Sequence, residues 1–251
     1  MFYVFRIPLI IVYFLAVALA GLIISLFRPF NPDNTTLIGR IYGWGGTRIL
    51  GMKVNVRGKE HLQGLGACVI TANHQDNLDL FVYGGMLPRR TVSLGKKSLR
   101  YIPFFGQMYW LAGNVLINRS SKTQSLATMN EATVALRDNN TSIWIFPEGT
   151  RNRGKNMLRF KKGAFKTAQE AGVPVLPVCA SSYVKHMNLG KWHSGTVEIQ
   201  ILPPIMPERL ATDNLDGVID ECWNNMMETI EQLDSTLEQA AQKPATANSY
   251  S

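Results

Sequence analysis

Residues 67–79 read ACVITANHQDNLD, and the change of character within this stretch indicates how the chain folds. Residues 67–72 are apolar and are followed at once by polar residues, as expected for a short buried strand. Comparable runs follow at residues 91–94, 114–117, 142–146, 175–179 and 196–202, with helix-like segments between them, most clearly at residues 125–137 and 164–171. This alternation predicts an α/β fold, with a mostly parallel mixed sheet flanked by helices.

Residues 7–27 form an almost unbroken apolar run between Arg6 and Arg28. Its length is close to the ~20 residues that cross the hydrocarbon core of a bilayer as a helix. Residues 18–20 resemble the small-residue site at which a signal peptide is cleaved, but the apolar run continues well past them. We therefore predict a retained N-terminal membrane anchor.

Residues 35–52 combine apolar and aromatic side chains with arginines, a composition typical of interfacial helices. Together with the anchor they could form a helical hairpin that enters one leaflet, or a surface helix that follows a spanning one. A helix of the protein core is a third interpretation. We predict three regions: a membrane anchor and interfacial helical segment at residues 1–52, an α/β domain at residues 53–237 and a flexible tail at residues 238–251.

The overall composition is basic, with 26 Lys and Arg against 18 Asp and Glu and a net charge of +8. This surplus favours an anionic partner, and the apolar N-terminal run indicates a lipid bilayer rather than nucleic acid, for which no familiar motif is present. A predicted helix at residues 215–233 has an acidic face that anionic lipid would repel, so we assign it to the protein core. Cys68, Cys179 and Cys222 lack metal-binding spacing, which predicts buried, reduced thiols and no metal site.

A polar cluster follows the first predicted strand. His74 and Asp79 are five residues apart, so on an ideal helix their side chains would diverge by about 140°. They can meet only if His74 lies in the turn and Asp79 in the first turn of the next helix. A carboxylate in that place would hold one imidazole nitrogen and leave the other to take a proton, as in a general base. Asp76 is an alternative orienting group, and a purely structural polar cluster is the alternative interpretation.

A second polar turn follows the predicted strand at residues 142–146, where residues 142–151 read SIWIFPEGTR. Gly149 allows the backbone to approach a ligand closely. Glu148 can accept hydrogen bonds from hydroxyl groups, and Arg151 has the planar fork that binds phosphate. Further cations follow at Arg153, Lys155, Arg159, Lys161, Lys162 and Lys166. They indicate either a solvated basic face or attraction to acidic headgroups.

These blocks resemble the motifs of the glycerolipid acyltransferase family. Asn73, His74 and Asp79 match the family's NHxxxxD motif, and residues 146–151 match its FPEGTR motif. Residues 113–119, GNVLINR, are similar to its Gly/Arg block, and residues 173–178, VPVLPV, to its Pro-containing block. The four blocks occur in the family's order and span about half of the chain, and it is their combination that is specific, since any one block alone would not be.

The resemblance implies transfer of a fatty acyl group from acyl-CoA or acyl carrier protein to the sn-2 hydroxyl of lysophosphatidic acid (1-acylglycerol 3-phosphate), giving phosphatidic acid in phospholipid biosynthesis. It implies His74 as general base, oriented by Asp79, and acceptor binding by Glu148, Gly149, Thr150, Arg151, Arg119 and Lys96. It requires no cofactor and no metal. The implied location is the bacterial inner membrane, with the catalytic domain facing the cytoplasm, where the soluble donors are.

Three alternatives stay open from the sequence. The same chemistry could act on glycerol 3-phosphate, a lyso-ornithine lipid or another lysophospholipid. A metal-dependent hydrolase could use His74, Asp76 and Asp79, although the other histidines show no HExxH-type spacing. A non-catalytic lipid-binding protein would tolerate replacement of His74 and Asp79.

Overall fold

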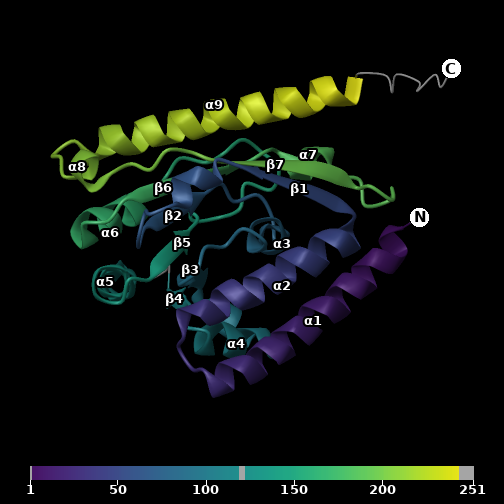
Figure 1. Cartoon of the computed structure of the whole chain (residues 1–251), viewed down its shortest axis with the longest axis horizontal. Coiled ribbons are helices and arrows are strands. Elements are labelled where there is room, and N and C mark those ends of the chain that lie inside the picture. The colour runs from purple at the N-terminus through teal and green to yellow at the C-terminus, as the bar shows by residue number, and fades with distance from the viewer. Residues whose placement is uncertain (1, 119–121, 243–251) are drawn as a thin grey trace.

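A central sheet organises the chain in the computed structural model, which describes residues 2–118 and 122–242, apart from the side chains of residues 122–127. The sheet has seven strands in the order β1-β7-β6-β2-β5-β3-β4 (Figure 1). They are β1 (Met52–Arg57), β2 (Val69–Ala72), β3 (Thr91–Lys96), β4 (Val115–Ile117), β5 (Ser142–Ile145), β6 (Val175–Ala180) and β7 (Gly195–Ile201). Among these strands only β6 and β7 pair antiparallel, so the predicted mostly parallel mixed sheet is confirmed.

Helices cover both faces of the sheet (Figure 1). One face carries α1 (Tyr3–Phe27), α2 (Pro32–Leu50), α3 (Asp79–Gly84) and α4 (Phe105–Leu111). The other carries α5 (Lys122–Asp138), α6 (Gly163–Ala171) and α9 (Leu215–Gln242). Shorter elements are η1 (Lys59–Leu62), η2 (Lys97–Tyr101), α7 (Tyr183–His186) and α8 (Pro207–Leu210).

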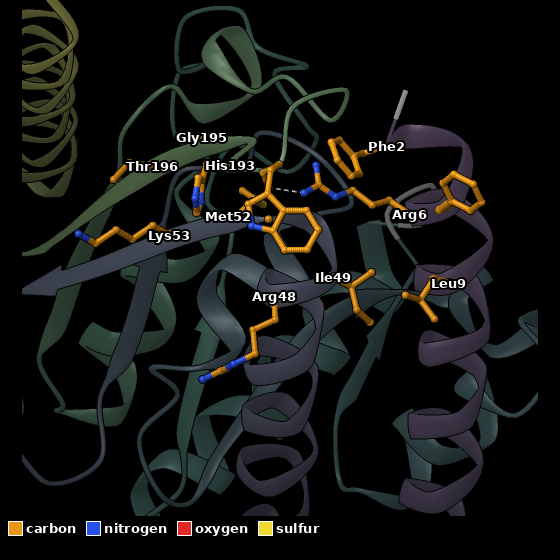
Figure 2. A pocket seen from close by; sticks show the side chains of 13 residues that line it. Phe2, Arg6, Leu9, Arg48, Ile49, Met52, Lys53, His193, Gly195 and Thr196 are labelled. Atoms are coloured by element: carbon orange, nitrogen blue, oxygen red, sulfur yellow. Dashed lines mark hydrogen bonds between the residues drawn. The ribbon is translucent and has the colours of Figure 1, made fainter. Parts of the chain in front are cut away.

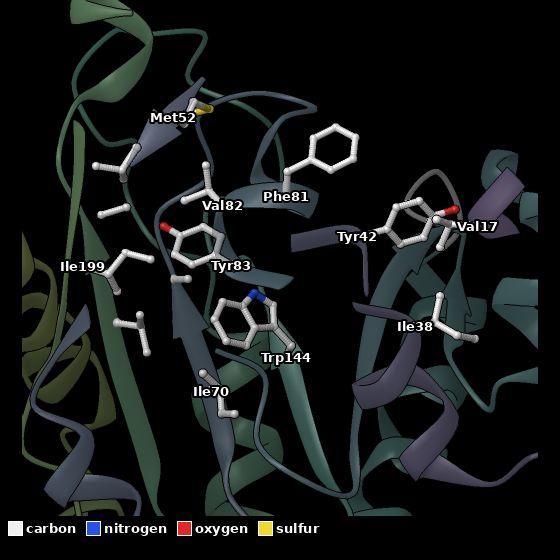
Figure 3. Packing of buried hydrophobic residues seen from close by; sticks show 14 of the residues in the cluster. Val17, Ile38, Tyr42, Met52, Ile70, Phe81, Val82, Tyr83, Trp144 and Ile199 are labelled. Carbon is white, nitrogen blue, oxygen red and sulfur yellow. The ribbon is translucent and has the colours of Figure 1, made fainter. Parts of the chain in front are cut away.

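The central strands β2, β5 and β6 are buried along their whole length, as expected for parallel strands with helices on both faces. Their residues alternate between two hydrophobic clusters, with Ile70 and Trp144 in one and Val69 and Ile143 in the other. Trp144 lies between Ile70 and Tyr83 in Figure 3, and the ring centroids of Trp144 and Tyr83 are 5.1 Å apart. This packing joins β2 and β5 to α3.

The edge strand β1 was not predicted, because its first residue falls in the segment assigned to the N-terminal region. Its sequence, MKVNVR, alternates apolar and polar side chains, and only its first residue is fully buried. It pairs parallel with β7, from Met52 opposite Gly195 to Arg57 opposite Gln200. Alternation of this kind is typical of a half-buried strand, so the pattern was present in the sequence.

Helix α2 has clear start and stop signals. The Asn31 side chain accepts a hydrogen bond from the backbone N–H of Asp33 at 3.0 Å, Pro32 is the first residue, and Gly51 ends the helix at φ 67°. Its buried side packs against α1 and α3. Its exposed side carries a stripe formed by Leu37, Ile41, Trp44 and Arg48. The segment predicted as interfacial or as core thus has both kinds of surface.

Helices α2 and α3 approach until their backbones touch. A Cβ atom on Gly43 would collide with the backbone of Gly84 and Gly85, and one on Gly84 would collide with the carbonyl of Gly39. Glycine at these positions therefore follows from the space available. Because α3 begins at Asp79, this contact also fixes the place of that residue.

Helix α1 is the one helix within residues 2–118 and 122–242 that is long and apolar enough to cross a membrane, judged by length and composition. One side packs against α2 and α4. The other exposes Tyr3, Val4, Phe5, Ile7, Leu9, Ile11, Val12, Leu15, Leu19, Ile23, Leu26 and Phe27. The buried Arg6 donates hydrogen bonds to carbonyl oxygens of the loop before β7, among them that of Leu189 at 2.9 Å. Helix α1 therefore lies along the domain (Figure 1).

Helix α9 confirms the helix predicted at residues 215–233 and its assignment to the core. It buries Val218, Ile219, Cys222, Met226, Ile230 and Leu233. The helix continues to Gln242, into the segment predicted as a tail at residues 238–251, of which residues 243–251 lie outside the described part.

The cysteines are buried and form no disulfide, as predicted, and burial raises the pKa of Cys68 to about 11 and that of Cys222 to about 12.

A Gly43→Ala substitution should destabilise the protein by about 1–3 kcal/mol, because α2 and α3 must separate to admit the methyl group. A chain of this size melts roughly 2–4 °C lower for each kcal/mol lost. Thermal unfolding of the purified protein in detergent measures the shift. Gly85→Ala is the matched control, since a Cβ there meets open space among the described residues. Equal melting temperatures for the two variants would contradict the close contact.

Candidate active site

His74 and Asp79 meet at the carboxyl end of β2. The strand ends at Ala72, His74 lies in the turn that follows, and Asp79 is the first residue of α3. The imidazole Nδ1 is 2.6 Å from the carboxylate Oδ2 of Asp79. The structure therefore has the local arrangement that the five-residue spacing requires, with one residue in the turn and the other at the helix start.

The Asp79 carboxylate is buried and collects several donors. Its Oδ2 also accepts hydrogen bonds from the backbone N–H of Gln75 at 2.8 Å and of Asp76 at 3.2 Å. Its Oδ1 accepts one from the hydroxyl of Tyr183 at 2.8 Å. The carboxylate of Asp76 instead accepts from a backbone N–H within the turn. Asp79, rather than Asp76, is therefore the group that orients His74.

The imidazole of His74 is also held from its face. It stacks on Phe146, with ring centroids 4.0 Å apart and an angle of 13° between the planes. The His74 side chain keeps 20% of its surface exposed, whereas that of Asp79 keeps 2%. With Nδ1 at the carboxylate, Nε2 is the nitrogen through which the ring can exchange a proton with a bound molecule.

Asn73 fixes the turn to the neighbouring strand β6. Its side-chain amide donates to the carbonyl of Ala180 at 2.9 Å and accepts from the N–H of Ala180 at 2.8 Å. The hydroxyl of Tyr83 donates to the Asn73 side chain at 2.8 Å. Neither Tyr83 nor Tyr183 was predicted as part of the site. Tyr183 is more than a hundred residues from Asp79 in sequence, whereas Tyr83 is only ten residues from Asn73. No local pattern marks either residue.

Glu148 lies beneath the turn, with 2% of its surface exposed. One carboxylate oxygen accepts from the backbone N–H of His74 at 2.6 Å, and the other from that of Leu158 at 2.8 Å. Both oxygens thus bind backbone N–H groups, and the contact with acceptor hydroxyls stays a prediction. Burial raises the pKa of Glu148 to about 7, although these two N–H groups act in the opposite direction.

The turn after β5 brings cations together beside His74. Gly149 has φ +73°, and the guanidinium of Arg151 donates a hydrogen bond to the side-chain carbonyl of Asn77. Lys161 crosses this turn, because a Cβ on Gly149 would come within 2.7 Å of its Nζ. The backbone N–H of Lys161 donates to the carbonyl of Pro147 at 2.9 Å, which fixes the lysine there.

The other predicted binding residues are less closely placed. Thr150 is exposed on the same turn. Lys96 is exposed at the end of β3, which pairs in parallel with β5, so it lies at the same edge of the sheet. Arg119 lies outside the described residues.

Two cations of the basic run after the turn pair with acidic residues of α9. Lys162 pairs with Asp216 of α9 at 2.7 Å, and Arg159 with Asp220 at 3.5 Å. The Arg159 guanidinium also stacks over Trp223, 3.9 Å from the ring centroid. These two cations therefore belong to the α9 side of the molecule. For them the solvated basic face is the better interpretation, since exposed pairs contribute little stability.

A sequence profile described as Acyltransferase matches residues 53–181. This chain belongs to the acyltransferase family. It is 39% identical over 234 residues to the 1-acyl-sn-glycerol-3-phosphate acyltransferase of Escherichia coli (strain K12), covering 93% of this chain and 95% of that protein. It is 38% identical over 234 residues to the enzyme of the same name from Haemophilus influenzae, covering 92% and 96%.

A solved structure shares the fold of this acyltransferase. The crystal structure of the 1-acyl-sn-glycerophosphate acyltransferase from Thermotoga maritima aligns with a TM-score of 0.70 at 22% identity. The alignment covers 98% of this chain and 100% of that one. The likeness confirms the α/β fold flanked by helices.

The raised pKa of Glu148 predicts a pH-dependent stability of the acyltransferase. Between the ordinary value of 4.5 and about 7, the folded protein binds more protons at this carboxyl than the unfolded chain does. Its contribution to stability therefore falls as pH rises through that window. A Glu148→Gln variant lacks the titration, so the melting temperature of the wild type minus that of the variant should decrease from pH ~5 to pH ~8.

Thermal unfolding of both proteins across this pH range makes the measurement. The two proteins share their other titrating groups, so those that do not interact with Glu148 cancel in the difference. A difference that stays constant over this range would show that Glu148 ionises at an ordinary pKa, and one that rises with pH would also contradict the raised pKa.

Proposed function

We propose that this acyltransferase transfers a fatty acyl group from a soluble thioester, acyl-CoA or acyl carrier protein, to the sn-2 hydroxyl of 1-acylglycerol 3-phosphate. The product is phosphatidic acid, for phospholipid biosynthesis. The observation that carries the proposal is the 2.6 Å contact between His74 and the buried Asp79 at a sheet edge that also gathers cations. The names of the relatives from Escherichia coli and Haemophilus influenzae support the acceptor.

The proposed reaction needs one proton transfer in each direction. Nε2 of His74 removes the hydroxyl proton as the acceptor oxygen attacks the thioester carbonyl. The Asp79 carboxylate stabilises the imidazolium that forms, as in other His–Asp arrangements. When the C–S bond breaks, the proton returns from His74 to the leaving thiolate. This route forms no covalent acyl-enzyme, and we expect it to need no metal or cofactor.

The acceptor phosphate is proposed to lie between the cations of the turn. Arg151 is oriented by Asn77, and the ammonium of Lys161 lies over Gly149 in the same turn. A planar guanidinium and an ammonium together suit a phosphate monoester. Lys96, from the neighbouring strand end, adds positive charge. Glu148 is proposed to act through the His74 backbone that it holds.

Replacement of His74 by alanine should lower turnover at least about a hundredfold, because general-base catalysis commonly contributes 10²–10⁴ in rate. Asp79→Asn should also lower it, since it leaves the imidazole without a carboxylate. His186→Ala, at an exposed histidine, is the control and should keep wild-type turnover. The assay combines purified protein, a labelled thioester and a panel of lyso-acceptors, with chromatography of the products.

The same assay separates the alternatives. Undiminished turnover in a folded His74→Ala variant would contradict the mechanism. Activity with another lysophospholipid but not with lysophosphatidic acid would replace the acceptor and keep the reaction type. Loss of activity on chelation would favour a metal-dependent hydrolase, whereas we expect the activity to survive chelation.

Helices α1 and α2 are proposed to seat the enzyme in one leaflet of the membrane. The N-terminal end of α1 is held by Arg6. Just beyond its other end, the N–H of Phe30 donates to the carbonyl of Leu111 at 2.7 Å, and Phe30 packs on Trp110. A helix tied to the domain at both ends cannot stand across a bilayer by itself. Its exposed apolar side fits one leaflet of the inner membrane, with the domain in the cytoplasm.

Such a seat suits the proposed substrates. The acceptor carries one acyl chain and the product carries two, and each buried methylene adds about 0.8 kcal/mol of lipid affinity. An enzyme at the interface acts on these lipids without extracting them, while the soluble thioester reaches it from the water side.

A Phe5→Lys/Val12→Lys variant should bind vesicles at least about a hundredfold more weakly, because each apolar side chain contributes about 1.5–3 kcal/mol when buried. These side chains are 70% and 63% exposed on α1. Val134→Lys, at an exposed position of α5, is the control and should bind as the wild type does. Flotation with phospholipid vesicles measures binding.

Two outcomes would contradict this seat. Unchanged flotation of the double variant would exclude α1 as the anchor. In reconstituted vesicles, an N-terminal epitope shielded from protease while a C-terminal epitope is cleaved would show that α1 spans the bilayer.

A further inference from the structure

A pocket of about 600 Å³ lies at the N-terminal end of α1, and none of the residues that line it belongs to the His74 turn. It is bounded by α1, the last turn of α2, the start of β1 and the loop that leads into β7 (Figure 2). Its apolar lining comes from Phe2, Phe5, Leu9, Ile49, Met52 and Trp192. Its size is that of pockets that bind small molecules, about 300–1,000 Å³.

The pocket has two chemically different ends. Figure 2 shows Leu9 and Ile49 close together on the side toward α1, and Lys53 with His193 on the opposite side. Arg48 points away from α1 at the rim. Among the described residues that line the pocket none is acidic, so its charge suits an anion.

The walls of the pocket are held in place by polar contacts. Arg6 donates hydrogen bonds to the carbonyls of Leu189 and Lys191 at 2.9 and 2.5 Å, which fix the loop that carries Trp192. A Cβ on Gly51 would collide with the Arg6 guanidinium and with the Trp192 carbonyl. The pocket is therefore formed before any ligand binds, which lowers the entropic cost of binding.

The cationic rim is joined to an aromatic side chain of the α2 stripe. The Arg48 guanidinium stacks over Trp44, 4.4 Å from the ring centroid, and donates to the Trp44 carbonyl at 2.6 Å. Trp44 is 64% exposed. Arginine and tryptophan side chains each have an apolar part and a polar end. They are therefore common in the headgroup region of a membrane, where apolar and polar surroundings meet.

We propose that this pocket binds one anionic phospholipid of the bilayer. One acyl chain lies along Leu9 and Ile49, and the phosphate lies at Arg48 and Lys53. The apolar end is continuous with the exposed side of α1 through Phe5 and Leu9, so a lipid in the leaflet can enter sideways without leaving the membrane. The proposal rests on the membrane seat of α1 and is independent of the acyl-transfer reaction.

The bound lipid would set the depth of the domain at the interface. Arg48 belongs to the end of α2, and Lys53 to β1. A phosphate shared by these two residues places the start of the sheet at the level of the headgroups.

Photolabelling of the full chain in phosphatidylcholine vesicles tests the proposal. Two probes carry the same diazirine acyl chain, one on phosphatidylglycerol and one on phosphatidylcholine, and mass spectrometry identifies the labelled peptides. The anionic probe should label the peptides that contain Met52 and Trp192 roughly tenfold more strongly, since each cation near an anionic headgroup favours it several-fold. An Arg48→Gln/Lys53→Gln variant should lose that preference.

Two matched controls separate this site from general attraction to the membrane. Arg28→Gln/Arg100→Gln removes the same charge from other exposed positions and should keep the preference. Leu9→Trp fills the apolar end without a change of charge and should remove most of the label. Leu19→Trp, at a similarly exposed position of α1 outside the pocket, should not.

Three results would overturn the proposal: equal labelling by the two probes, equal labelling of the Leu9→Trp and Leu19→Trp variants, or displacement of the label by lysophosphatidic acid but not by phosphatidylglycerol. The last would make the pocket a substrate site. Because the readout is labelling rather than turnover, failure here is distinct from failure of the proposed reaction.

Discussion

The buried carboxylate of Asp79 is the group on which the arrangement of the site depends. It accepts hydrogen bonds from the His74 ring, from two backbone N–H groups of the turn and from the Tyr183 hydroxyl. Loss of such an acceptor leaves buried donors unpaired, at about 1–3 kcal/mol each. The same atoms therefore hold the turn, the start of α3 and the segment after β6, and the orientation of the imidazole follows from the folding of the sheet edge.

A second set of contacts reaches the same turn from the opposite face of the sheet. The indole N–H of Trp223 on α9 donates to the carbonyl of Leu158 at 3.0 Å. The N–H of Leu158 donates to Glu148, which in turn accepts from the N–H of His74. The C-terminal helix thus supports the backbone of His74 through two intermediates. The acidic face of α9 pairs with part of the basic run on the way.

The sequence predicted what depends on local pattern. The buried strands were predicted from short apolar runs. The five-residue spacing allowed only one local geometry in which His74 could contact Asp79. Partners from distant segments were not predicted, because Tyr183 and Leu158 reach the site only through the order of strands in the sheet. Glu148 shows the same limit: its motif marked it as polar and important, but its direction toward backbone N–H groups depends on how residues 158–161 cross the turn.

The glycine contact between α2 and α3 joins the N-terminal helices to the turn that carries His74. Two helices whose backbones touch have no side chains between them that could adjust, so a tilt of one helix displaces the other. Helix α3 starts at the aspartate that aims the histidine. A displacement of α2 relative to the sheet would therefore reach the contact between Asp79 and His74 through backbone alone, with no side chain in between to absorb it.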